Sequence, residues 1–132
     1  MRFGDLEGLT SLPIKRIRRR FRNEDILTVL PVSGAAQRDS VLVATSPTLA
    51  VLTSDAGAKS GLWMTQWAPW DAVSFSEDDD ADDGLDDDNV YRLTIHVGRL
   101  TFVAQLAGPR GQRALRDFVV AAQTQRRVSA TP

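Results

Sequence analysis

The stretch that decides the fold is the last third of the chain, NVYRLTIHVGRLTFVAQL at residues 89–106 and GPRGQRALRDFVVAAQTQ at residues 108–125. Alternation in the first part indicates two strands, each with apolar residues on one face. These residues are Tyr91, Leu93, Ile95 and Val97 in the first strand and Leu100, Phe102, Ala104 and Leu106 in the second. Gly98-Arg99 between them suits a two-residue hairpin turn. In the second part, one helical stripe carries Leu115, Phe118, Val119 and Ala122. The pattern predicts a β-hairpin that leads into an amphipathic helix.

Five further strand-like runs precede this hairpin. They are rich in Val, Leu, Ile, Thr and aromatic residues, are separated by turn residues, and span 26–32, 40–46, 48–53, 62–67 and 70–76. Because no helical crossover separates them, the sheet should be antiparallel. We expect a mainly β fold: a seven-stranded bent sheet, or partly open barrel, capped by a C-terminal helix over residues 109–125.

A short helix is expected before the first strand. Pro13 suits an early helical turn, and Ile14, Ile17 and Phe21 form a narrow apolar stripe. The expected organisation is therefore a basic helical segment at residues 1–22, one domain at 23–125 with an acidic insertion at 77–88, and a flexible tail at 126–132.

Composition excludes several kinds of chemistry. The 132 residues suit one domain, and the absence of cysteine excludes disulfides, thiolate nucleophiles and Cys-ligated zinc. His96 is the only histidine and thus the only candidate for the base of a catalytic triad, but one titratable ring without a partner makes no site, and a solvated or core-edge histidine is the favoured interpretation. We expect no enzyme activity, no metal and no cofactor. The N-terminal residues lack a signal-peptide pattern and no apolar run approaches membrane-spanning length, which favours a cytoplasmic protein.

The net charge of −1 hides a strong separation of charge. Residues 77–88, EDDDADDGLDDD, carry nine of the seventeen acidic groups, so the rest of the chain holds eight acidic and sixteen basic groups. We expect this acidic block to be a solvated, mobile loop whose deletion leaves the fold intact. Weak cation binding and contact with basic groups stay open as alternatives, although the spacing fails the calcium-loop pattern of an EF-hand.

The opposite charge is concentrated at residues 15–22, KRIRRRFR. This basic run contains six cations: Lys15, Arg16, Arg18, Arg19, Arg20 and Arg22. Three interpretations are open: a solvated helix end, a site for anionic lipid or another polyanion, and a contact with the acidic block that competes with such a partner. Nucleic acid is disfavoured, because the basic run has no interleaved platform of aromatic residues and the pI is about 5.7.

A cluster of large apolar residues is the other candidate site. Trp70 is expected in the core. Trp63 and Trp67 are four residues apart on a strand and share a face; with Met64 they form either edge packing or a protein-binding site.

Taken in order, these signals resemble those of the bacterial PH-like domains, a GRAM-related group within the pleckstrin-homology (PH) superfold. The resembling stretches are Asn23–Leu27, the strand pair Ser40–Thr45 and Leu49–Thr53, the strand Trp70–Phe75, and the closing hairpin and helix. Ser46-Pro47-Thr48 departs from the basic residue usual there in the family, and the acidic block looks like an insertion.

The resemblance implies a binding module without catalysis. Domains of this plan often dock a protein or peptide along a strand edge, and others bind anionic membranes. The expected function is docking of a protein or peptide partner. The alternative is peripheral binding of anionic lipid or another polyanion through the basic run.

Overall fold

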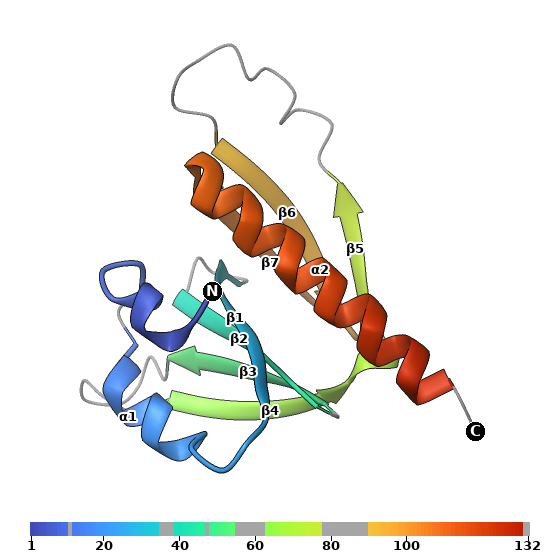
Figure 1. Ribbon diagram of the computed structural model, residues 1–132, viewed down its shortest axis with the longest axis horizontal. Coiled ribbons are helices and arrows are strands. Elements are labelled where there is room, and N and C mark those ends of the chain that lie inside the picture. The colour runs from blue at the N-terminus through green and yellow to red at the C-terminus, as the bar shows by residue number, and fades with distance from the viewer. Residues whose placement is uncertain (11, 35–38, 47, 55–62, 78–89, 131–132) are drawn as a thin grey trace.

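The computed structural model describes residues 1–10, 12–34, 39–46, 48–54, 63–77 and 90–130. Seven antiparallel strands form one curled half-barrel sheet that a long C-terminal helix covers (Figure 1). The strands are β1 (Ile26–Ser33), β2 (Asp39–Thr45), β3 (Thr48–Ser54), β4 (Trp63–Pro69), β5 (Val73–Glu77), β6 (Val90–Val97) and β7 (Leu100–Ala107). The helical elements are η1 (Phe3–Leu6), α1 (Ile14–Arg20), η3 (Trp70–Ala72) and α2 (Gly108–Ala130). The predicted fold class is confirmed.

The strand order β4-β3-β2-β1-β7-β6-β5 joins two meanders. Strands β1–β4 pair in sequence order, as do β5–β7, and residue Ser33 pairs with Val103 where the two halves meet. Three boundaries differ clearly from expectation, and the first is that β4 continues to Pro69, two residues beyond its expected end at residue 67. Residues 70–72 form the 3₁₀ turn η3 that links the halves rather than the start of a strand, and α2 continues to Ala130, beyond its expected end at residue 125.

The inner face of the sheet is closed by α2, as the apolar stripe predicts. Phe118 is fully buried and its ring packs against Trp70 and Phe75, with centroids 6.2 Å and 6.1 Å away. The Trp70 indole N–H also donates to the main-chain carbonyl of Thr45 at 3.1 Å. Trp70 is 1% exposed, so its predicted core position is confirmed.

The outer face of the first half-sheet carries a second apolar layer. Here η1 and α1 cover alternate residues of β1, β2 and β3, and the layer is made by Phe3, Leu6, Leu12, Ile14, Ile17, Phe21, Val29, Val41, Val43, Ala50 and Leu52. These three strands are consequently buried on both faces, which explains their nearly continuous apolar sequences. Residues 1–22 are thus packed on the sheet.

The start of α2 approaches β7 very closely at Gly111. A Cβ atom at this buried position would lie 2.7 Å from Leu106 Cβ and 2.8 Å from its carbonyl carbon. We expect Gly111→Ala to lower the free energy of unfolding by about 1–3 kcal/mol, because backbone must move to admit the methyl group. Urea denaturation measures the effect. Gly4→Ala is the matched control, since its Cβ meets nothing within 4 Å; equal losses from both variants would contradict the explanation.

Candidate functional site

The strongest candidate surface is the outer edge of β4, which pairs with no further strand in the described part of the chain. This strand stands last in the sheet order, and every residue from Met64 to Trp67 is exposed. Met64 is 50% and Trp67 51% exposed, which is unusual for such large apolar side chains. The strand Trp63–Pro69 contains no charged residue. It therefore lacks the charges with which proteins commonly protect an edge strand from pairing.

The register shows which main-chain groups of this edge are free to pair. Val29 donates its N–H to the carbonyl of Met1 at 3.0 Å, away from β2. Hydrogen-bonded and non-hydrogen-bonded pairs alternate along an antiparallel ladder. The side toward which the Val29 main chain points therefore fixes, through the residue pairs of β1 with β2, β2 with β3 and β3 with β4, which main-chain groups of β4 point away from β3. The result is that the N–H and C=O groups of Trp63, Thr65 and Trp67 point outward.

Pro69 provides independent evidence for this orientation of the β4 main chain. It pairs with Thr48, yet it has no N–H, so it must occupy a position whose main chain points away from β3. Positions 63, 65 and 67 share this alternation. The β4 edge therefore presents main-chain donors and acceptors in the order that a further strand would need.

The predicted aromatic site is divided between the two faces of this strand. Trp63 packs against the outer apolar layer, and Trp67 lies on the same face, as predicted. Met64 pairs with Thr53 and points to the opposite face. The three side chains thus form no single patch, but they flank both sides of the free edge.

The predicted basic cluster lies on α1 and the turn that follows it. All six cations are exposed. Lys15, Arg18, Arg19 and Arg22 surround an open depression of about 630 Å³ that Phe3, Phe21, Glu24 and Ile26 also line. One carboxylate thus faces four cations, so the depression favours an anionic ligand.

Aromatic packing joins the basic cluster to the β4 edge. The Phe21 ring lies 6.2 Å from Phe3 and 5.7 Å from Trp67, measured between centroids. Phe21 itself follows directly on α1 and is buried. The two surfaces that the sequence predicts as separate candidates are therefore neighbours on the outer side of the sheet.

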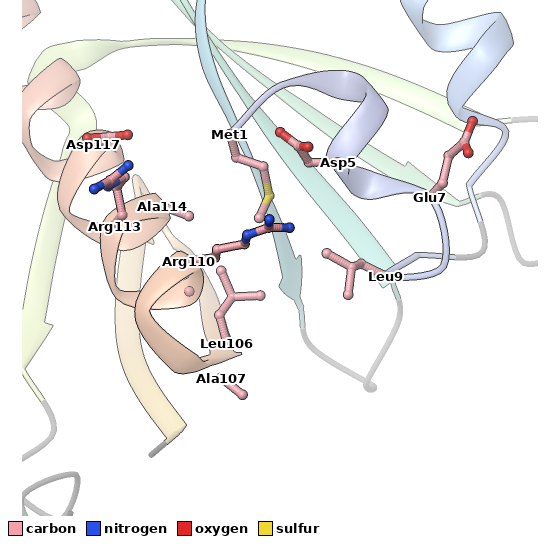
Figure 2. A pocket seen from close by; sticks show the side chains of 11 residues that line it. Met1, Asp5, Glu7, Leu9, Leu106, Ala107, Arg110, Arg113, Ala114 and Asp117 are labelled. Atoms are coloured by element: carbon pink, nitrogen blue, oxygen red, sulfur yellow. The ribbon is translucent and has the colours of Figure 1, made fainter. Parts of the chain in front are cut away.

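A further cavity, which the sequence patterns did not indicate, lies between the N-terminal residues and the start of α2. It encloses about 730 Å³ and is lined by Met1, Asp5, Glu7, Leu9, Leu106, Ala107, Arg110, Gly111, Arg113, Ala114 and Asp117. Figure 2 shows Arg110 reaching from α2 toward the end of the Met1 side chain, with Asp5, Glu7 and Leu9 on the facing wall. Because two arginines and three carboxylates line the cavity, its lining favours neither an anionic nor a cationic ligand.

Pro31 marks a smaller depression of about 120 Å³ between β1 and β7, which shares Leu9 and Leu106 with this cavity. By the alternation described above, its main chain faces β7, where it offers no N–H. The strands β1 and β7 pair at Ser33 and Val103 alone among the described residues. Beside Pro31, β1 and β7 do not pair. The N–H of Val29, which would donate to β7 if the two strands paired along their whole length, donates to the carbonyl of Met1 instead.

His96 lies half-buried on the outer face of the second half-sheet. Its Nε2 is 2.8 Å from Ser76 Oγ, and its Nδ1 is 3.3 Å from Thr101 Oγ1. A Ser-His pair in a hydrolase is oriented by a carboxylate, whereas the third partner here is a hydroxyl. The arrangement agrees with the interpretation of His96 as a core-edge histidine.

The acidic block is predicted as a loop over residues 77–88, but Glu77 is the last residue of β5 and pairs with Leu93. Residues 78–88 lie outside the described part of the chain. Within the described residues, no cluster of three or more His, Cys, Asp or Glu side chains is placed to hold a metal ion. In the same part of the chain, no helix is both long enough and apolar enough to cross a bilayer.

Comparisons with known proteins add no relatives. The chain matches no family model, no curated protein and no solved structure.

Proposed function

We propose that this chain is a non-catalytic interaction module that docks an extended segment of a protein partner as an additional strand on β4. The observation that carries the proposal is the β4 edge itself: unprotected, uncharged and flanked by half-exposed Trp67 and Met64. Strand addition derives affinity from main-chain hydrogen bonds and specificity from alternate side chains. Membership of the PH superfold is part of the proposal and is supported by the strand number, the antiparallel order and the capping helix.

The other edge of the sheet is less suited to docking. Strand β5 has five residues, against seven in β4, and its first residue Val73 is buried. A longer edge offers more main-chain pairs, and exposed aromatic side chains are frequent anchors in binding sites. These differences favour β4.

Thr65→Pro should weaken docking by at least about tenfold while leaving the fold intact. The substitution removes an N–H that points outward and that the sheet does not use, and Pro31 and Pro69 already occupy equivalent positions in β1 and β4. The measurement is a selection of short peptides from a random display library on the wild-type chain. The selected peptides are then titrated against both proteins by fluorescence anisotropy, with an expected loss of at least about tenfold from the missing hydrogen bonds.

Thr65→Val is the matched control, because it changes the same side chain but keeps the N–H. Its affinity should stay within about twofold of wild type, since a surface substitution of this kind has little energetic effect. Circular dichroism confirms that both variants are folded. Selected peptides that bind Thr65→Pro as tightly as wild type, or a library that yields no binder, would refute docking on β4.

The basic cluster favours a second candidate function, peripheral binding to an anionic membrane. Its four cations around one depression supply electrostatic attraction, but the short helix offers little apolar surface for insertion. Binding to phosphatidylglycerol vesicles that weakens steeply with salt, and that Arg18→Gln with Arg19→Gln removes, would support it. Binding that survives this double substitution would exclude the basic cluster as the membrane site. Both functions are proposed for the cytoplasm, the second at the membrane surface.

A further inference from the structure

We infer that the segment docked on β4 is acidic, with carboxylate side chains directed to the outer face beside α1. The inference rests on the proposed strand addition and specifies the chemistry of its partner. A strand placed on β4 must alternate its side chains between the two faces of the sheet. One set would therefore lie next to Trp67, and Phe21 links Trp67 to the basic cluster.

The cations beside Phe21 lie on α1 and in the turn that follows it. Strand β4 has no charged residue, so it neither attracts nor repels a charged segment. The helix α1 contributes Lys15, Arg16, Arg18, Arg19 and Arg20, and Arg22 follows it. Lys15, Arg18, Arg19 and Arg22 line one depression together with Phe21, and exposed charges act over about 8 Å to 10 Å in physiological salt.

Acidic groups near the cluster are too few to neutralise it. Glu24 lines the same depression, and Asp25 follows it in the sequence. The depression itself is lined by four cations, Lys15, Arg18, Arg19 and Arg22, and by the single carboxylate of Glu24, so it attracts anions and repels cations. A neutral segment could use the free edge, but only an acidic one would also use the cluster.

The same charge argues against a second copy of this chain as the occupant. Pairing of two β4 strands about a two-fold axis perpendicular to the sheet would place both α1 helices on one face of the joined sheet. Each helix would bring its arginines toward the other, and like charges destabilise such an interface. An acidic segment from another protein relieves the repulsion that a second copy would increase.

The test uses three synthetic peptides of about eight residues, the length of an ordinary strand, which alternate threonine with glutamate, glutamine or lysine. Binding to the full chain is followed by the NMR shifts of the Trp67 indole and the Thr65 amide. At low salt the glutamate peptide should bind at least about tenfold more tightly than the glutamine peptide, the sum of several exposed ion pairs. The advantage should shrink as salt rises, and the lysine peptide should bind most weakly.

Two double variants separate the basic cluster from the general charge of the protein. Arg19→Gln with Arg22→Gln should reduce the affinity for the glutamate peptide by about 3–10-fold and leave the glutamine peptide unaffected. Arg99→Gln with Arg116→Gln removes the same number of exposed charges from the β6–β7 turn and α2. The affinities of this control for both peptides should stay within about twofold of wild type. Equal effects of the two double variants would overturn the role of α1.

The outcomes distinguish this inference from the function on which it rests. If the glutamine peptide binds as well as the glutamate peptide and Thr65→Pro weakens both, strand addition stands and the acidic partner is wrong. If Thr65→Pro binds the glutamate peptide like wild type, strand addition itself is wrong. Self-association in analytical ultracentrifugation that Thr65→Pro removes would replace the acidic partner with a second copy.

Discussion

Phe118→Ala should lower the free energy of unfolding by about 3–5 kcal/mol, a large share of the stability of a domain this size. Phe118 is fully buried at the centre of α2 and contacts the rings of Trp70 and Phe75, one from the turn between the half-sheets and one from β5. Its loss would leave a cavity where the helix, the turn and the sheet meet, and these elements cannot all move inward to fill it.

Chemical denaturation followed by far-ultraviolet circular dichroism measures this change. Val120→Ala is the control, because Val120 lies on the same helix but is 52% exposed, and its substitution should change stability by less than about 0.5–1 kcal/mol. A midpoint that shifts equally in both variants would show that α2 is not the lid of the inner core.

Ile17→Ala should lower the free energy of unfolding by about 2–5 kcal/mol, although α1 has only seven residues. A helix this short is not stable alone, so α1 depends on its packing against the sheet. Ile17 is fully buried in the outer apolar layer, between the basic surface and the strands. The substitution should therefore destabilise the sheet as well as the helix.

Tryptophan fluorescence distinguishes the two layers during unfolding. Trp63 and Trp67 report on the outer side of the sheet and Trp70 on the inner core. The fluorescence and circular dichroism transitions of Ile17→Ala should shift together, while Arg20→Ala, at an exposed position of the same helix, should stay near wild type. A lost fluorescence change with an unshifted circular dichroism transition would mean that residues 1–22 are an independent appendage.

The strands and the capping helix could be predicted because their apolar residues follow one period along each element. Alternation along β6 and β7 and the stripe through Phe118 each reflect a single buried face. The outer layer was harder to predict. Ile14, Ile17 and Phe21 indicated that α1 is buried, but Phe3 and Leu6 lie in a short 3₁₀ turn that has no long periodic pattern. Their role depends on strands that are distant in sequence.

The candidate site could be predicted in its parts but not in its arrangement. The sequence indicates a basic run and an aromatic cluster, whereas the contact between Phe21 and Trp67 depends on how α1 crosses the sheet. That β4 ends the sheet is likewise a property of strand order, which local patterns do not contain. Pro31, inside an otherwise regular strand, was an available sign that one side of β1 does not continue its ladder.

The narrow junction between β1 and β7 has a consequence for the kinetics of folding. Nearly all strand pairs in the sheet join neighbours in sequence, so each meander can form through short loop closures at a small entropic cost. Among the described strands, the pairing of Ser33 with Val103 is the contact between residues far apart in sequence, and it spans about half of the chain. Low mean sequence separation between contacting residues is associated with rapid folding. This chain should therefore fold faster than β-sandwiches of similar length, with the docking of α2 and the meeting of the two halves as its late events.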